Sequence, residues 1–256
     1  LQANYKPLKG LTINFNYAPK FATSFAKNNQ KRIEYFNFDS KALLFANPTK
    51  NTLSNSNANS LNNYLRLQAA YTKDFDWLNF NVLVGAEQTD NTSQNFSASR
   101  EATLFPELEQ LDNYPALNQN SSGDASSWAL RSYYGRMNLV ASDKYLFEIN
   151  SRYDGSSRFS EEYKRFGLFP SFSAGWIMSK ENFMRNIKWL SLLKLRASWG
   201  TMGNQNIGTY PYISSVILGS GVFNGNIVSV AAQNTVANRK ITWESTTIKN
   251  VGLNAA

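Results

Sequence analysis

The chain has 256 residues, no cysteine, no histidine and a formal net charge of +8 at pH 7. Without these two residue types there is no disulfide framework, no thiol nucleophile, no imidazole base and no Cys or His metal site, so Ser-His-Asp and Cys-His catalysis are excluded. Aromatic residues make up 14% of the chain and charged residues only 17%, and Asn is abundant, which is typical of β-structure with polar loops. No stretch approaches the roughly 20 apolar residues of a membrane helix.

Apolar and polar residues alternate over most of the chain, which predicts β-strands with one apolar and one polar face. In 11–17, for example, Leu, Ile, Phe and Tyr alternate with Thr and Asn. Many predicted strands have ten residues or more, against about five or six in ordinary globular proteins, and a tilted membrane strand needs roughly 9–11. The length favours membrane-crossing strands. In chain order they cover 1–5, 11–24, 61–73, 77–88, 128–140, 144–153, 167–180, 191–203 and 242–254.

The connections between these predicted strands alternate between short and long. Alternate connections of an up-and-down meander emerge at the same rim, so all short turns are expected at one rim and all long loops at the other. That asymmetry is typical of outer-membrane barrels. The Asn- and Ser-rich tracts 51–60, 89–99 and 118–127 are predicted to be solvated loops, with a rim that contacts glycan or peptide as the alternative. Residues 181–189 are predicted to form a helical turn or two.

Several local motifs have a physical interpretation. Asp143-Lys144 predicts a tight polar turn, and 154–157 (DGSS) predicts a turn at the outer end of a strand. Pro170 removes a ladder donor from a strand pattern, so a bulge or a strand start is expected there. Four aromatic residues suit the girdles at the two lipid interfaces, namely Tyr133, Tyr145, Trp176 and Trp199.

A set of motifs in the second half of the chain is more specific than a barrel pattern. They are Asp143-Lys144-Tyr145, 152–159 (RYDGSSRF), 169–171 (FPS) before 174–176 (AGW), 193–198 (LKLRAS) before 203–205 (GNQ), 241–247 (ITWESTT) and 250–253 (NVGL). Together they resemble the C-terminal part of the barrel of SusC/RagA-type TonB-dependent transporters, the nutrient importers of Bacteroidetes outer membranes. Residues before about 127 resemble that family only in style.

This resemblance implies an all-β fold, an antiparallel transmembrane β-barrel segment with about nine strands of a barrel of about 22. Residues 1–256 would all belong to the barrel domain, and the plug domain and the N-terminal region that contacts TonB would lie elsewhere in a larger polypeptide. The implied location is the cell outer membrane. The implied partners are outer-membrane lipid, a SusD-like surface lipoprotein, TonB, the plug and the rest of the barrel. The resemblance implies import of oligosaccharide or peptide, with no enzyme activity and no cofactor.

Polar residues on the predicted strands are the candidates for a lumen-facing surface. We expect most of them to contact the plug or lumen water rather than substrate, because the interior of a large barrel is polar. They are Arg66, Gln68, Arg136, Asn138, Glu148, Asn150, Arg152, Lys194 and Arg196.

No catalytic or metal site is predicted. Glu161-Glu162 is interpreted as surface charge, and Asp154 with its two neighbouring serines offers too few carboxylates for the 6–8 oxygen ligands that Ca²⁺ takes. The basic residues are dispersed, so no nucleic-acid partner is expected.

Two other classes remain open at this point. One is an outer-membrane barrel that acts as an adhesin or an enzyme through its extracellular loops, with a carboxylate base in place of histidine. The other is a soluble β-sandwich that binds carbohydrate.

Overall fold

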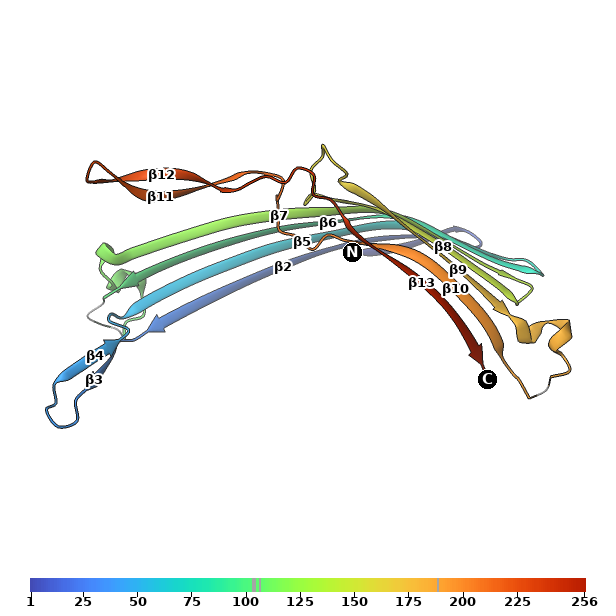
Figure 1. The fold of residues 1–256 in the computed structure, drawn as a ribbon, viewed down its shortest axis with the longest axis horizontal. Coiled ribbons are helices and arrows are strands. Elements are labelled where there is room, and N and C mark those ends of the chain that lie inside the picture. Colours follow the sequence, from blue (N-terminus) through green and yellow to red (C-terminus); the bar gives the residue numbers. More distant parts are fainter. Residues whose placement is uncertain (103–104, 106, 188) are drawn as a thin grey trace. The chain divides into compact units, whose positions relative to one another are not determined.

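The computed structural model describes residues 1–102, 105, 107–187 and 189–256, and most of them lie in β-strands (Figure 1). Nine strands form one sheet in which sequence neighbours pair, with two hairpins inserted outside it. No helix of the described residues is long and apolar enough to cross a membrane. In sheet order the strands are β1 (Gln2–Leu8), β2 (Leu11–Gln30), β5 (Thr52–Asp74), β6 (Leu78–Glu101), β7 (Gln119–Ala141), β8 (Tyr145–Ser156), β9 (Phe166–Ile177), β10 (Leu193–Asn204) and β13 (Glu244–Ala255).

Two connections that were predicted to be loops contain separate antiparallel hairpins. One consists of β3 (Ile33–Phe36) and β4 (Leu43–Asn47), and the other of β11 (Ser215–Phe223) and β12 (Asn226–Thr235). Asn224 and Gly225 both have positive φ at the tip of the second hairpin, as a tight two-residue turn requires.

The remaining short elements are four 3₁₀ helices. They are η1 (Leu111–Asn113), η2 (Ala116–Asn118), η3 (Met178–Lys180) and η4 (Asn182–Met184). The helical turn predicted within 181–189 is present as η4.

The chain forms two compact units. The first contains Leu1–Ala18, Asn63–Asp90 and Trp128–Ala256, and the second contains Pro19–Asn62 and Asn91–Ser127. The long strands β2, β5, β6 and β7 run from one unit into the other. Because β5 has 23 residues and β6 has 24, each is about twice as long as the roughly 9–11 residues that cross a bilayer.

The prediction that the Asn- and Ser-rich tracts are loops was wrong, because these tracts extend β5, β6 and β7 within the second unit. Their short polar side chains hydrogen-bond across strands. The Thr23 hydroxyl donates to Asn59 Oδ1 at 2.7 Å, and the Ser97 and Ser122 hydroxyls lie 2.7 Å apart. Such pairs stabilise a sheet without an apolar face, so composition alone did not distinguish these strands from loops.

Two further local predictions were wrong. Asp154, Gly155 and Ser156 continue β8 in register with β7, so the turn begins only at Ser157. Pro170 forms neither a bulge nor a strand start, because β9 begins at Phe166 and its ladder with β8 runs unbroken past Pro170. The ladder between β9 and β10 ends at the neighbouring Ser171, so the missing N–H of Pro170 lies where pairing on that side stops.

The predicted sorting of connections is largely present. Residues 9–10, 75–77 and 142–144 form tight turns, whereas 31–51, 102–118, 157–165 and 205–243 are longer. The exception is 178–192, a longer connection at the short-turn end that carries η3 and η4.

Backbone hydrogen bonds connect the tight turns of the first unit to neighbouring strands and turns at the same end of the strands. Thr72 donates to Gly10 O at 2.9 Å, and Ser142 donates to Trp77 O at 2.7 Å. Gly10 has a φ of 87°, and a Cβ there would lie 2.4 Å from Thr72 O, so both the turn and the close approach require glycine.

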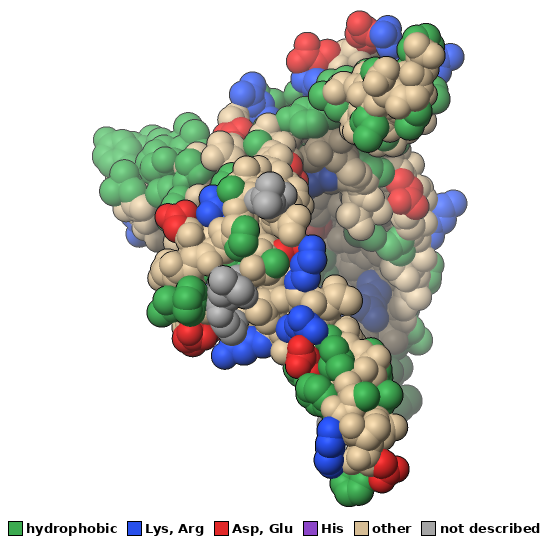
Figure 2. Space-filling model, turned by 90° about the vertical axis from the view of Figure 1, so that its left-hand side faces the viewer, with side chains coloured by type: hydrophobic (Ala, Val, Ile, Leu, Met, Phe, Trp, Pro, Cys, Tyr) green, Lys and Arg blue, Asp and Glu red, His purple; other side chains and the backbone are tan. Residues whose placement is uncertain are grey.

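Large hydrophobic side chains reach the surface over much of the molecule (Figure 2). On β8, for example, Phe147 is 49% exposed and Tyr153 is 46% exposed. Among the described residues the buried hydrophobic side chains are Leu53, Tyr114 and Phe159. A soluble protein rarely leaves such a continuous apolar face uncovered, which argues against the soluble sandwich.

Candidate functional site

The two faces of the sheet differ sharply in chemistry in the first unit. On β8 the side chains of Tyr145, Phe147 and Ile149 lie on one face, and Glu148 and Asn150 lie on the other. The register with β7 and β9 places Leu139 and Ala174 opposite Phe147, and Asn138 and Ser173 opposite Glu148. We call the first face the apolar face and the second the polar face.

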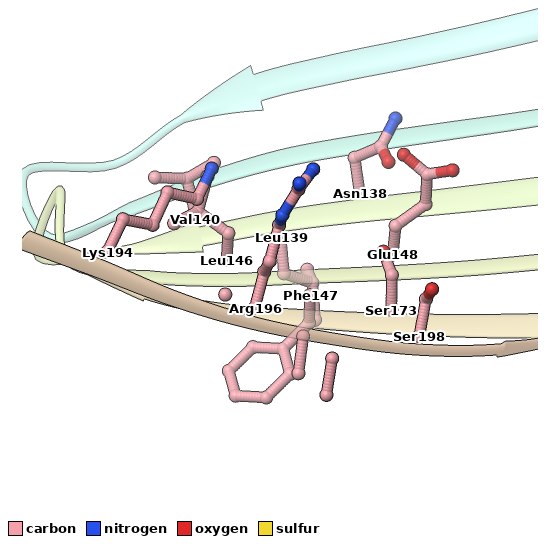
Figure 3. A pocket seen from close by; sticks show the side chains of 13 residues that line it. Asn138, Leu139, Val140, Leu146, Phe147, Glu148, Ser173, Lys194, Arg196 and Ser198 are labelled. Atoms are coloured by element: carbon pink, nitrogen blue, oxygen red, sulfur yellow. The ribbon is translucent and has the colours of Figure 1, made fainter. Parts of the chain in front are cut away.

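All nine candidate residues lie on the polar face. Direct pairing aligns Arg136 with Asn150 and Asn138 with Glu148, and Arg152 follows two residues further along β8. Figure 3 shows Asn138, Glu148, Lys194 and Arg196 on one side of the sheet, with the Phe147 ring on the other. The Tyr134 hydroxyl, on the same face, donates to Gln68 at 3.0 Å, which places Gln68 and its i−2 neighbour Arg66 there too.

Arg152 is the centre of an ionic network on this face. Its Nη2 lies 2.8 Å from Glu87 Oε1 on β6 and 3.2 Å from Asp154 Oδ1 on β8. The Tyr64 hydroxyl donates to Glu87 at 2.9 Å, and the guanidinium lies 5.4 Å from the centroid of the Tyr134 ring. The network therefore joins β5, β6, β7 and β8 through side chains as well as through the backbone.

Glu87, Tyr64 and Tyr134 were not among the predicted site residues. The alternation of strand 77–88 places Glu87 on the same face as Asn79 and Asn81. The sequence could therefore have identified Glu87 as a polar-face residue. Its partner Arg152 lies 65 residues away in the sequence, and no local pattern links the two.

Gly85 makes room for the Tyr134 ring. A Cβ at Gly85 would lie 2.5 Å from Tyr134 Cζ and 2.6 Å from its hydroxyl oxygen. We expect Gly85→Ala to displace the ring, to break its hydrogen bond to Gln68 and to lower the free energy of unfolding by about 1–3 kcal/mol. Denaturant unfolding of the complete protein in detergent measures the change.

Gly135→Ala is the matched control. A Cβ there would meet Leu83 O at 3.7 Å and Val84 Cγ1 at 3.9 Å, which are ordinary contacts. Equal losses in the two variants would mean that the close approach of Tyr134 to Gly85 is not what the protein requires.

Next to this network lies a second polar group. Arg136 Nε donates to Asn150 Oδ1 at 2.8 Å, and Asn150 Nδ2 donates to Glu148 Oε1 at 2.6 Å. Glu148 also lines a depression of about 500 Å³ whose polar lining comes from Asn138, Ser173, Lys194, Arg196 and Ser198 (Figure 3).

At the outer end of β8, buried aromatic contacts hold the long connections together. Phe159 is fully buried, with its ring centroid 5.1 Å from that of Trp243. Trp243 Nε1 donates to Arg165 O at 3.0 Å, and its ring meets Phe169 edge-on at 5.3 Å. Tyr212 donates to Ser157 O at 3.2 Å. Residues 157–165 are thus tied to both ends of the connection between β10 and β13.

At the opposite end, Glu181 receives three hydrogen bonds. The Tyr145 hydroxyl donates at 2.7 Å, Lys144 Nζ at 3.0 Å and Trp176 Nε1 at 3.1 Å. These donors, Tyr145 first, lower the pKa of Glu181 from the usual 4.5 to about 2. The carboxylate therefore joins the ends of β8 and β9 to the η3–η4 connection.

This lowered pKa gives a pH prediction. A carboxylate whose pKa is lower in the folded state stabilises the protein fully above its unfolded value near 4.5, and the contribution is lost as the pH falls toward 2. We expect Glu181→Gln to be less stable than the parent at pH 7 and to show a smaller loss between pH 4.5 and pH 2. Thermal unfolding across that range, with parent and variant in parallel, tests it. Parallel curves for the two proteins would contradict the assignment.

The site has the chemistry of a structural and binding surface. Among the described residues, no three acidic side chains lie close enough together to hold a metal ion. Arginine and carboxylate groups on the polar face hydrogen-bond with one another, and the sequence provides neither histidine nor cysteine to activate a nucleophile.

Comparison with known proteins agrees with this geometry. Residues 2–255 match the family model described as "TonB dependent receptor-like, beta-barrel". The chain is 33% identical over 192 residues to TonB-dependent receptor SusC of Bacteroides thetaiotaomicron, which covers 72% of this chain and 18% of SusC. It is 31% identical over 230 residues to TonB-dependent receptor P39 of Formosa agariphila, covering 85% of this chain and 22% of that receptor.

Solved structures show the same fold. The RagAB peptide importer in its "closed-closed" state superposes with a TM-score of 0.85 at 21% identity, covering 99% of this chain and 27% of that chain. A second structure, of the RagAB peptide transporter, gives a TM-score of 0.84 at 20% identity. The chain thus spans about a fifth to a quarter of its relatives' length. The sequence relatives are TonB-dependent receptors and the solved structures are of a peptide transporter, and proteins of these classes are not enzymes. From its family match, its sequence relatives and its sheet, the chain belongs to the TonB-dependent receptor β-barrel family and is a SusC/RagA-like segment of such a barrel.

Proposed function

We propose that the complete protein is a TonB-dependent importer of the outer membrane, and that residues 1–256 form part of its barrel wall. The observation that carries this proposal is the pair of opposite faces on long strands. The exposed apolar face of β7–β10 suits lipid, and the polar face opposite suits a water-filled interior.

The free edges of the sheet support a larger barrel. Within the described residues, β1 pairs only with β2, and β13 pairs only with β10. Lipid cannot satisfy the backbone groups of an open edge, so a membrane barrel must close. Further strands of the same polypeptide would pair with β1 and β13, and a plug domain would fill the interior.

In this proposal the polar-face residues act mechanically and electrostatically. The Glu87–Arg152–Asp154 network would hold the wall rigid beside the plug. The tied connections at the outer end would face the cell exterior and meet a SusD-like surface lipoprotein. Energy would come from TonB, which contacts a region outside this chain. The resemblance to SusC/RagA-type transporters makes oligosaccharide or peptide the expected cargo, and one solved structure with the same fold is of a peptide importer.

A growth and uptake experiment tests this function. The complete gene is deleted in its native host, and cells are supplied with defined oligosaccharides or oligopeptides as the limiting nutrient. We expect loss of uptake of one cargo class, and the same loss when TonB or the partner lipoprotein is removed. Unchanged uptake of both classes, or uptake that persists without TonB, would contradict the proposal.

A further inference from the structure

Two cations at the short-turn end of the polar face have no partner among the described residues. Lys194 and Arg196 are two residues apart on β10 and therefore share a face. Neither side chain makes a hydrogen bond or an ion pair within the part of the chain that the structure describes. Arg152, on the same face, faces two carboxylates, and Arg136 donates to Asn150. Within the described residues, the basic pair therefore differs from the other two arginines in having no side-chain partner.

Glycines on the flanking strands leave room for the two side chains. A Cβ at Gly252 of β13 would lie 2.6 Å from Arg196 Nε and 3.3 Å from its Cγ. A Cβ at Gly175 of β9 would lie 3.2 Å from Lys194 Cε. Neither glycine has a positive φ, so the backbone conformation does not require glycine there. What the missing Cβ atoms provide is space for the stems of the two cations.

The basic pair lines the depression of about 500 Å³ on this face. Asn138, Ser173 and Ser198 add neutral hydrogen-bonding groups beside the two cations (Figure 3). The one carboxylate in the lining, Glu148, already accepts a hydrogen bond from Asn150. Two cations, an amide and two hydroxyls around an open space are the groups that bind a carboxylate.

We propose that Lys194 and Arg196 form a subsite for the carboxylate group of an anionic solute that passes through the barrel. This subsite rests on the proposed function, since it requires that the polar face line the transport path. Gly175 and Gly252 act as positioning residues, because they set the height of the two cations above the sheet. A solute without a negative charge would gain no binding free energy from Lys194 and Arg196 when it passes the same surface.

The binding experiment uses the complete protein, purified in detergent, and two labelled probes that differ only in charge. The probes are a tripeptide of three glutamates and a tripeptide of three glutamines. We expect the parent protein to bind the glutamate probe about tenfold more tightly at low salt. The preference should shrink as salt is added, because exposed charges are screened.

Three variants locate the effect. The double variant Lys194→Gln/Arg196→Gln should bind both probes equally. Lys249→Gln removes a cation from β13 on the apolar face, opposite Trp199, and should keep the preference. Gly252→Ala keeps both charges but lifts Arg196, so it should reduce the preference by several-fold. Circular dichroism, and the difference in electrophoretic mobility between heated and unheated samples, show whether each variant is folded.

The other outcomes overturn the subsite. A glutamate preference that survives in the double variant would place anion binding elsewhere. A parent protein without preference, combined with a lower melting temperature of the double variant, would show that a carboxylate of the enclosed domain occupies the pair. Failure here is distinguishable from failure of the proposed function, because a protein that imports neutral cargo in cells but has no glutamate preference keeps its function and loses only the subsite.

Discussion

Phe147→Arg should weaken insertion of the barrel. Phe147 lies on the apolar face of β8, 49% exposed, between Leu139 on β7 and Ala174 on β9. An arginine on the lipid face of a barrel costs about 2–4 kcal/mol at the bilayer midplane and about 0–1 kcal/mol near the interfaces. Phe147 is the third residue of β8, so the expected cost lies below the midplane value, and the burial of the phenylalanine ring in lipid is lost as well. The measurement is the fraction of complete protein that becomes folded and membrane-integrated in lipid vesicles.

Ser173→Arg provides the matched control for this charge. Ser173 lies on β9 opposite Glu148, so it is at the same level of the sheet but on the polar face. We expect this variant to insert like the parent, because its new cation meets water and a carboxylate. Equal defects in the two variants would mean that the faces are assigned to the wrong solvents.

Phe159→Ala should loosen the outer connections. The ring is fully buried and contacts Trp243, so its removal leaves a cavity. Substitutions of this kind cost about 3–5 kcal/mol. Because Phe159 and the Arg165 carbonyl both tie 157–165 to Trp243, we expect the loss to appear first as faster hydrogen exchange and proteolysis in these connections.

Phe223→Ala removes the same atoms from an exposed position. Phe223 lies at the tip of β11 and is 75% exposed. We expect no change in the exchange of 157–165 in this variant. If Phe159→Ala behaved like Phe223→Ala, the aromatic cluster would not be what holds the connections.

The sequence predicted the sheet best where the two faces differ most. The alternation in 11–17 and 144–153 contrasts aromatic and aliphatic residues with amides and charges, so the period of two is unmistakable. In 51–60 eight of the ten residues are Asn, Ser or Thr, spread over both faces, and only Leu53 and Ala58 are apolar. A pattern method detects a difference between faces, and two apolar residues on opposite faces do not make one.

The site was predictable in part for a similar reason. The alternation of apolar and polar residues along each strand assigns all nine candidates to the polar face, and this alternation can be read from the local sequence. Contacts between distant segments were not predictable, since nothing near Phe159 indicates that Trp243 will cover it. The same holds for Glu87 and Arg152, and for the glycines under Lys194 and Arg196, whose role depends on the neighbouring strand in the sheet.

The neutral cross-strand pairs of the second unit have a consequence for its response to salt and acid. Thr23 with Asn59, Ser93 with Ser126 and Ser97 with Ser122 link their strands through groups that carry no charge at any natural acidity. Changes in salt concentration or pH would therefore leave these links almost equally strong. Strands joined in this way can keep one shape while the chemistry of the surroundings changes.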